Sequence, residues 1–407
     1  MRQPPTNALA TNPNIQVCVT PVKASTTDLS TLMGDWRALW TTITAAKQGH
    51  YNSLAPGFFL SPLWIETWLT QHGLHTGEDL WCVRSYGGDD VLRAMGFFCS
   101  HRARRHGVLT VRQLVLHATG QAPQDRITTE YNNLLCAPGE RADHWAAILR
   151  QLRQSNFPPW DELVLPGITE PLADDLARAG QHQITATHVV ATAPSYHVNL
   201  DQLRRNSVDN VEDFIATLSK NSRSQIRRAL RLYEQSGPLT LSRTDNVETA
   251  QSWFNSLNHL HTDKWETKTD AASLNNPSAL PFHRALIEAG IAKGKIDLLR
   301  ICAGETPIGY LYNFVEGATA SFYAGGFRPE TDNRLKPGLV CHALATAYYL
   351  QRLCSVYDFM GGNDRYKASL GVPGPAIMTV ALQTVHPGLA LERMARRLKK
   401  RFIREPS

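Results

Sequence analysis

Two stretches of this chain, one in each half, repeat the same local plan. The segment DLWCVRSYGGDDVLRAMGFFCSH (79–101) lines up with KIDLLRICAGETPIGYLYNFVEG (295–317). Each is typical of a strand, a turn of glycine and acidic residues, and a second strand that opens on glycine and an aromatic residue. Self-similarity of this kind predicts a duplicated unit, so we expect two units of one fold in tandem.

The segments around both copies alternate between strand-like and helix-like patterns, which is typical of an α/β or α+β fold with a mixed sheet. The pattern breaks at Ala193-Pro194, where we place the boundary between the units. We therefore expect an N-terminal unit over 14–195, a C-terminal unit over 196–386, and a basic amphipathic helix and tail over 387–407.

The length and composition of the chain are those of an ordinary globular protein. Its 407 residues are 43% hydrophobic and 19% charged, which is enough for two domains with cores. Seven cysteines without a Cys-x-x-Cys pair indicate reduced, buried thiols, and they give no support for a metal site. The N-terminal segment lacks the apolar core of a signal peptide and no run is long enough to span a membrane, so we expect a cytoplasmic protein.

The net charge of +6 is concentrated in two elements, Lys220–Arg231 with five cations and no acid, and Glu392–Arg404 with seven cations and one acid. The rest of the chain is mildly acidic, which makes a nucleic-acid partner improbable and indicates local anion contacts instead. The second element carries an apolar stripe, for which we expect docking on the body, with an anionic membrane surface touching 391–404 as the alternative. The stripe consists of Leu391, Met394, Leu398 and Phe402.

The stretch YDFMGGNDRYKASLG (357–371) ends an apolar strand on two glycines and then gathers an acid, a phenol and two cations. Taken alone it is typical of a solvated loop, with a second turn at Gly371-Val-Pro-Gly. The presence of other motifs in the same chain favours a functional site at 357–371 over a solvated loop.

Those motifs stand in a fixed order: FFLSPLWIETWL (58–69), TEYNNLL (129–135), SKNSRSQIRRALR (219–231), HLHTDKW (259–265), KPG (336–338) and YDFMGGNDRYK (357–367). The ordered set resembles the CelD/BcsL-type group of the GNAT acyltransferase superfamily, whose acetyltransferase domain is also called BioF2-like. The resemblance covers nearly the whole chain. It implies two tandem GNAT-like units, similar to the Fem aminoacyltransferases and mycothiol synthase, with acetyl-CoA or another acyl-CoA as co-substrate and no metal.

Two elements of the C-terminal unit suit coenzyme A. A helix that begins at Pro337 offers free N–H groups and a partial positive charge to the pyrophosphate, and Arg334, Lys336, Gly338 and Leu339 lie at that end. The preceding strand, with Tyr323, Gly325 and Gly326, would offer its backbone to pantetheine, as the resemblance implies. Glycines inside a strand indicate a bulge or the close approach of another backbone. The alternatives are an ordinary helix start and an ordinary strand end.

Three residues of 357–367 are candidates for catalytic roles, and the resemblance to Fem-like proteins implies that of Lys367. Asp358 would deprotonate the acceptor if burial raises its pKa, Tyr366 would protonate the leaving thiolate, and Lys367 would stabilise the oxyanion. Asp358 serves equally well as a structural acid that caps a loop or pairs with Arg365.

Acceptor contacts are expected across the cleft. His261 and Trp265 lie near the end of a long helix, and either His261 or His259 is a second candidate base. Arg223 and Arg227 belong to a basic helix that the resemblance places at the cleft mouth. A solvated helix face and simple packing are the alternatives.

The sequence therefore predicts an acyltransferase that moves an acetyl or acyl group from acyl-CoA to an amine or hydroxyl of an envelope or polysaccharide-related precursor. The N-terminal unit is expected to be structural or acceptor-binding. Two alternatives stay open. One is a Fem-like transferase that uses aminoacyl-tRNA, and the other is a non-catalytic GNAT scaffold that binds polyanions or a protein partner.

Overall fold

The computed structural model describes residues 14–23, 26–45, 57–77, 79–154, 157–180, 182–265, 274 and 276–403, with backbone alone at 26–27, 262–265 and 399–403. The elements of the N-terminal half are β1 (Gln16–Pro21), α1 (Thr26–Ala45), α2 (Pro62–Trp68), β2 (Leu80–Tyr86), β3 (Leu92–Arg105), β4 (Leu109–Leu116), β5 (Leu135–Cys136), α3 (Arg141–Gln151), β6 (Glu162–Thr169) and α4 (Glu170–Ala179). Short helical turns lie at Phe58–Leu60, Leu69–Gly73 and Pro138–Glu140.

The second half begins with β7 (Ala186–Asn199), α5 (Leu200–Arg205), α6 (Val211–Thr217), α7 (Lys220–Glu234), β8 (Leu239–Arg243), α8 (Val247–Trp265) and α9 (Ala279–Gly290). It continues with β9 (Ile296–Ala303), β10 (Thr306–Glu316), β11 (Thr319–Phe327), α10 (Pro337–Gln351), β12 (Val356–Gly361), α11 (Arg365–Leu370), β13 (Val372–Gln383) and α12 (Pro387–Ile403).

All thirteen strands form one mixed sheet, in the order β1-β2-β3-β4-β6-β13-β7-β12-β11-β10-β9-β8, with β5 on the side of β3. The two ends of this order mirror one another. In β1-β2-β3-β4-β6 the successive pairings are antiparallel three times and then parallel, and β8-β9-β10-β11-β12 repeats that pattern. The duplication that the sequence predicts is therefore present as two tandem units of mixed α/β fold.

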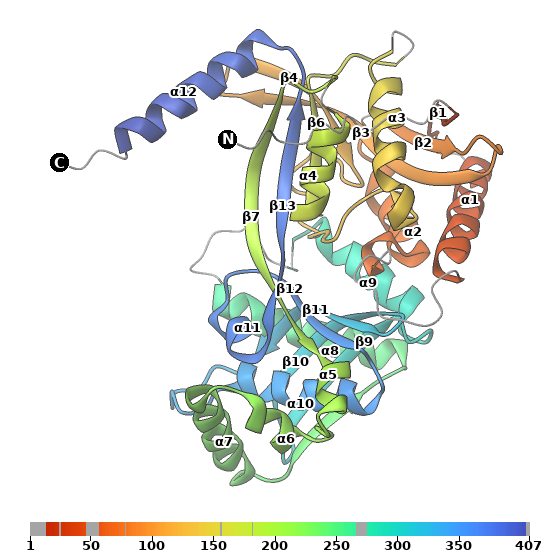
Figure 1. The fold of residues 1–407 in the computed structure, drawn as a ribbon. Coiled ribbons are helices and arrows are strands. Elements are labelled where there is room, and N and C mark those ends of the chain that lie inside the picture. Colours follow the sequence, from red (N-terminus) through yellow and green to blue (C-terminus); the bar gives the residue numbers. More distant parts are fainter. Residues whose placement is uncertain are drawn as a thin grey trace.

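The two units exchange a strand at the centre of the sheet. β7 follows β6 and α4 in sequence but pairs with β12 of the second unit, whereas β13 follows β12 and pairs with β6 of the first. β7 and β13 also pair with each other over most of their length. Figure 1 shows both strands running from one unit into the other. The units are therefore built into one continuous sheet.

The predicted break at Ala193-Pro194 is wrong, because β7 runs through it. Proline cannot donate to a strand ladder, and it is tolerated where the register is irregular. The register of β7 with β13 shifts at this point, and the Pro194 carbonyl accepts the N–H of Gly362 at 2.9 Å. The predicted loop and turn at 363–374 are also wrong, since α11 begins at Arg365 and β13 begins at Val372.

A shared core fixes the two units against each other. Phe58 and Trp64 of the first unit lie in the same buried cluster as Phe282 and Phe314 of the second. The rings of Phe58 and Phe314 stack with centroids 4.3 Å apart, and Trp64 meets Phe282 edge-on at 4.9 Å. Aromatic pairs of this geometry add to the area they bury, so the interface is packed like a domain interior.

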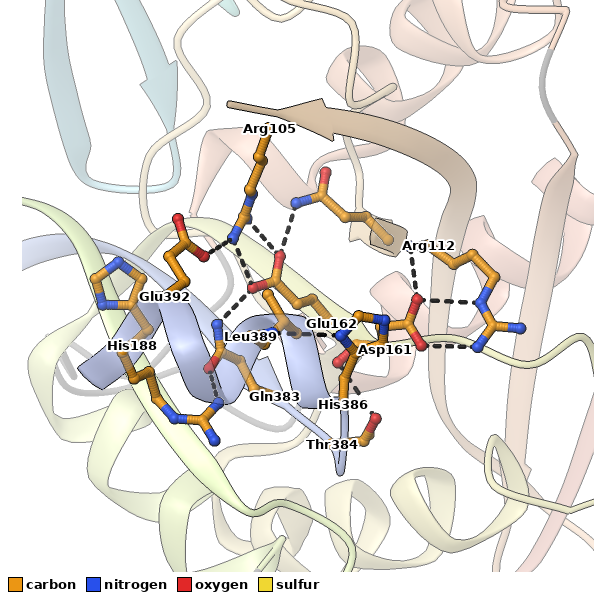
Figure 2. A network of polar contacts seen from close by, with 12 residues as sticks. Arg105, Arg112, Asp161, Glu162, His188, Gln383, Thr384, His386, Leu389 and Glu392 are labelled. Atoms are coloured by element: carbon orange, nitrogen blue, oxygen red, sulfur yellow. Dashed lines mark hydrogen bonds and ion pairs between the residues drawn. The ribbon is translucent and has the colours of Figure 1, made fainter. Parts of the chain in front are cut away.

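A polar network joins α12 to the sheet (Figure 2). Glu162, fully buried on β6, accepts a two-pronged pair from Arg105, with N–O distances of 2.6 and 3.1 Å. Gln383 of β13 donates to the same carboxylate at 2.6 Å, and Arg105 also reaches Glu392 of α12 at 3.0 Å. The helix thus docks through polar residues. The prediction that it docks through its apolar stripe is wrong, because Leu391, Met394 and Leu398 are exposed.

Glu162→Gln should lower the free energy of unfolding by about 3 kcal/mol, because it removes one of the two carboxylates, Glu162 and Glu392, that hold the largely buried guanidinium of Arg105. Glu66→Gln removes an exposed pair with Arg37 and is the matched control, with an expected loss of less than about 1 kcal/mol. Urea unfolding of both variants measures the difference, and equal losses would contradict the role given to the network.

Candidate active site

The site begins where β11 and β12 separate. These neighbouring parallel strands pair only from Thr319 and Val356 to Ser321 and Asp358. Beyond that point β11 continues to Phe327, while β12 ends at Gly361. The divergence leaves an open strand edge, which a ligand with amide groups can use as a strand would.

A cavity of about 220 Å³ lies at this divergence. The C-terminal unit supplies residues from α8, β11, β12 and α11, and an extended segment of the N-terminal unit closes the other side. The lining residues are Arg126, Thr128, Glu130, His261, Leu274, Phe322, Tyr323, Ala324, Met360, Gly361 and Lys367.

Glu130 comes from the N-terminal unit and contacts the end of β12. Its Oε2 accepts the N–H of Gly361 at 2.7 Å. A Cβ at Gly361 would stand 3.1 Å from the other carboxylate oxygen, so glycine gives this carboxyl its room. Gly167 makes room for the backbone of the segment that carries Glu130. It has a φ of 67°, and a hypothetical Cβ there would stand only 1.9 Å from the carbonyl oxygen of Thr129. Two glycines therefore allow Glu130 to reach the site.

Burial raises the pKa of Glu130 to about 7, and the nearby Asp358 acts in the same direction. The hydrogen bond from Gly361 and the charge of Lys367 oppose the shift. A carboxyl of this pKa is half ionised near neutrality, where a general base works best.

Lys367 lies on α11 and is buried, with its Nζ donating to the carbonyl of Gly361 at 2.5 Å. Burial lowers the pKa of this amine, and the carboxyls of Glu130, Asp364 and Asp358 oppose that effect. The hypothetical Cβ of Gly362 lies 2.8 Å from Nζ, and Gly362 has a φ of 137°. The Gly361-Gly362 pair of the sequence therefore gives space to both Glu130 and Lys367.

Asp358 lies beside the cavity, but it is not among the described residues that line it. Its Oδ1 accepts the N–H of Met360 at 2.8 Å, and it takes a hydrogen bond from the side chain of Tyr131. Burial raises its pKa. Met360 has a φ of 60°, which is unusual for a residue with a Cβ. In this position Asp358 fixes the turn that presents Gly361.

Helix α10 begins directly after the β11 edge and its loop. Lys336 is the N-cap residue, Pro337 occupies the first turn, and Gly338 lies against the ring of Phe327 at the end of β11. Lys336 forms no ion pair with any residue that the structure describes, whereas the guanidinium of Arg334 is engaged by Asp332 at 2.7 Å. Leu339 is half-buried and packs against the core. The helix start predicted for the pyrophosphate is thus present.

The two glycines of β11, Gly325 and Gly326, are required for partly different reasons. A Cβ at Gly326 would stand 2.4 Å from the carbonyl oxygen of Leu257, so Gly326 admits the backbone of α8. A Cβ at Gly325 would meet the rings of Phe322 and Phe327, and the Gly325 carbonyl contacts Nδ1 of His261 at 3.1 Å. The close backbone approach that the sequence predicts here comes from α8.

Tyr366 and Tyr323 lie on either side of the divergence. Tyr366 stacks on His342 with ring centroids 4.9 Å apart and meets the cavity residue Phe322 edge-on at 6.5 Å. Burial raises the pKa of Tyr366 well above its usual value, so its hydroxyl keeps its proton. Tyr323 lines the cavity and bonds to Thr128 of the N-terminal unit.

The predicted acceptor residues are only partly gathered. His261 lines the cavity. Arg223 and Arg227 lie on α7 and bond to α6, through the Ala216 carbonyl at 2.9 Å and Glu212 at 2.6 Å respectively. The side chain of Trp265 lies outside the described residues.

Sequence reasoning missed Glu130, Arg126 and Thr128. The contact of Glu130 with Gly361 spans 231 positions of the chain, and no local pattern connects them. The available signal was one acid in TEYNNLL, a motif used only for the resemblance. In the described part of the chain, no three His, Cys, Asp or Glu side chains gather in a way that could hold a metal ion.

The N-terminal unit has a cavity of about 240 Å³ at the corresponding place, where β4 and β6 diverge beyond Val115 and Val164. The described residues between β4 and β5, however, contain no helix to match α10. A helix that begins at the strand divergence therefore distinguishes the C-terminal unit among the described residues.

Comparison with known families identifies that unit. Residues 220–368 match the model of the acetyltransferase (GNAT) domain. This match runs from α7 to α11 and includes β11, α10 and β12. The C-terminal unit is a GNAT-type acyltransferase domain, and the chain is a transferase of that type.

Several solved structures of low sequence identity resemble this chain, and FemX shares its fold. FemX superposes with a TM-score of 0.54 at 10% identity, over 88% of this chain and 98% of FemX. The C-terminal domain of a putative lysylphosphatidylglycerol synthetase from Agrobacterium fabrum has a TM-score of 0.49 at 9% identity, over 89% and 96%. A tandem GNAT protein from the clavulanic acid biosynthesis pathway has a TM-score of 0.45 at 12% identity, over 91% and 99%. No curated protein matches the sequence.

The raised pKa of Glu130 makes the free energy of unfolding depend on pH. The folded state holds this proton more tightly than the unfolded chain, whose carboxyl returns to the usual value of 4.5. The contribution of the Glu130 proton to the free energy of unfolding is thus fully present below about pH 4.5 and is lost as the pH rises through about 7. The side chain in Glu130→Gln stays neutral at every pH. The free energy of unfolding of this variant, relative to that of the wild type, should therefore rise by on the order of 3 kcal/mol between about pH 4 and about pH 8.

Urea unfolding at the two pH values measures this gain. Glu234→Gln, at an exposed position, controls for the change in net charge. A difference between Glu130→Gln and the wild type that does not vary with pH would show that Glu130 has an ordinary pKa.

Proposed function

We propose that this GNAT-type transferase moves an acetyl or other acyl group from acyl-CoA to an amine or hydroxyl group of its acceptor. The observation that carries the proposal is the cavity at the divergence of β11 and β12. It places a buried carboxyl of raised pKa, Glu130, and a buried amine, Lys367, beside an open strand edge.

The fit to acyl-CoA rests on three features: the start of α10, the open edge of β11 and the cavity. The start of α10 with Lys336 would hold the pyrophosphate, and Gly338 would let the phosphate approach the backbone. The open edge of β11 would bond to the pantetheine amides. The cavity of about 220 Å³ has room for a small acyl group and the reacting atom of the acceptor.

In the reaction, the acceptor nitrogen or oxygen attacks the thioester carbonyl while Glu130 takes its proton. The carbonyl oxygen becomes negative, and the ammonium of Lys367 stabilises it. The C–S bond then breaks, the thiolate of coenzyme A accepts a hydrogen bond from the hydroxyl of Tyr366, which keeps its own proton, and the proton that Glu130 took from the acceptor is passed on to the thiolate. We give Asp358 a positioning role, because its carboxyl is already occupied by the N–H of Met360 and by Tyr131.

For the acceptor, we propose a precursor of an envelope component or polysaccharide, which rests on the resemblance to CelD/BcsL-type proteins. Arg126 and His261 line the cavity from the acceptor side. The guanidinium of Arg126 suits an anionic group on such a precursor. Under this proposal the N-terminal unit supplies both the base and part of the acceptor site.

The aminoacyl-tRNA alternative has weaker support. It needs free cations on α7, and the side chains of Arg223 and Arg227 are bonded to α6. The non-catalytic scaffold alternative gives no reason for burying a carboxyl at the strand divergence, since burial of an ionisable group has a cost.

Calorimetry with acetyl-CoA tests the proposal. We expect binding that Lys336→Glu weakens roughly tenfold or more, because the variant sets a negative charge against the pyrophosphate. Lys293→Glu makes the same change of charge at an exposed position between α9 and β9 and should leave the affinity unchanged. Absence of binding by the wild type to any of a series of acyl-CoAs would refute the acyl-CoA proposal.

A further inference from the structure

Helix α12 turns its polar side toward the protein. Leu389 is fully buried in its first turn, and one turn later the side chain of Glu392 is only 8% exposed. Arg393 donates to Gln383 at 2.5 Å, and Arg396 contacts Glu392 at 2.7 Å and His188 of β7. Figure 2 shows Leu389, Glu392 and His188 beside Gln383 and the buried Glu162. Ion pairs and hydrogen bonds therefore hold one side of the helix.

The apolar stripe lies on the other side. Leu391, Met394 and Leu398 are 63%, 57% and 47% exposed. At about 100° per residue, their mean direction is roughly 180° around the helix axis from that of the body-facing set, 389, 392, 393 and 396. Figure 1 shows α12 extending away from the sheet. An amphipathic helix of a globular protein usually buries its apolar side on the body, and this helix does the reverse.

The segments that anchor α12 also expose apolar side chains. Val108, in the turn between β3 and β4, is 88% exposed, and Val385, just before α12, is 82% exposed. Both segments belong to the anchor of α12, because His106 contacts Glu392 at 3.2 Å and the start of the helix packs on Leu109. Exposed apolar side chains that gather at one end of a molecule indicate an interaction surface.

The charge around the stripe restricts what can cover it. Residues 392–404 carry seven cations and one acid, and the described side chain of Arg397 lies exposed on the flank of the stripe. A second copy of the helix would bring the same cations together and would be repelled. A surface that is apolar inside and anionic outside satisfies both the stripe and the cations.

We propose that α12 rests on an anionic lipid bilayer, with Leu391, Met394 and Leu398 inserted among the acyl chains and Arg397 at the headgroups. In the described part of the chain, no helix has the length and apolar character needed to cross a bilayer, so the contact is peripheral. The network around Glu392 fixes the orientation of α12, and this orients the whole enzyme on the surface. The inference stands independently of the acyl transfer proposed above.

Vesicle flotation of the full chain tests the inference. The protein should float with vesicles that contain phosphatidylglycerol and stay behind with vesicles of phosphatidylcholine alone. The triple change Leu391→Asn, Met394→Asn and Leu398→Asn should abolish flotation. Arg397→Gln should weaken binding by about fivefold, the effect of one cation near an anionic surface, and added salt should weaken it further.

Leu353→Asn is the matched control, since Leu353 is an exposed leucine at the end of α10 and should have no effect on flotation. Because all five substituted positions are exposed, the melting temperature should stay constant in every variant. Failure of the wild type to float with anionic vesicles at low salt would overturn the inference. So would a self-associating wild type whose association the triple change abolishes.

Discussion

The exchange of β7 and β13 is the constraint on which the rest of the structure depends. Each strand completes the sheet of the unit to which it does not belong by sequence, and the two pair with each other at the centre. The units therefore cannot separate without breaking strand ladders and the aromatic contact between Phe58 and Phe314. This rigidity is what allows a loop of the N-terminal unit to place Glu130 on the N–H of Gly361, 231 positions away. An interface between loosely linked domains would not hold a 2.7 Å contact of this kind in register.

The same arrangement accounts for the electrostatics of the site. Enclosing Glu130 between the units removes its carboxyl from water, which raises its pKa to about 7, and the proximity of Asp358 adds to the effect. Lys367 is buried beside it and its pKa is lowered. Burial thus moves an acid and a base toward neutrality together, which is the arrangement that general base catalysis at neutral pH requires. Gly167, Gly361 and Gly362 allow this approach, since a Cβ at any of them would meet Thr129, Glu130 or Lys367.

The sequence predicts much of the fold and about half of this account of the site. The internal echo and the order of helices and strands predict the tandem units correctly, because periodicity and turn residues are local signals. The strand exchange escaped prediction because Pro194 is typical of a boundary, and only the tertiary register explains why a strand passes through it. Lys367, His261 and Tyr323 were found through their motifs and do line the cavity. Glu130 was not found, because its role depends on a contact between units that no pattern in TEYNNLL encodes.

The central claim is that a carboxyl of the N-terminal unit serves the chemistry of the C-terminal unit, and the pH dependence of acyl transfer tests it most directly. With acetyl-CoA and an accepted amine or hydroxyl substrate, we expect kcat/KM of the wild type to rise with an apparent pKa near 7 and then level off. Glu130→Gln should lose this rising limb and about 10²- to 10⁴-fold of the rate, while Asp358→Asn should retain the limb. A Glu130→Gln enzyme with the wild-type pH profile would contradict the account, as would an Asp358→Asn enzyme that alone loses the limb.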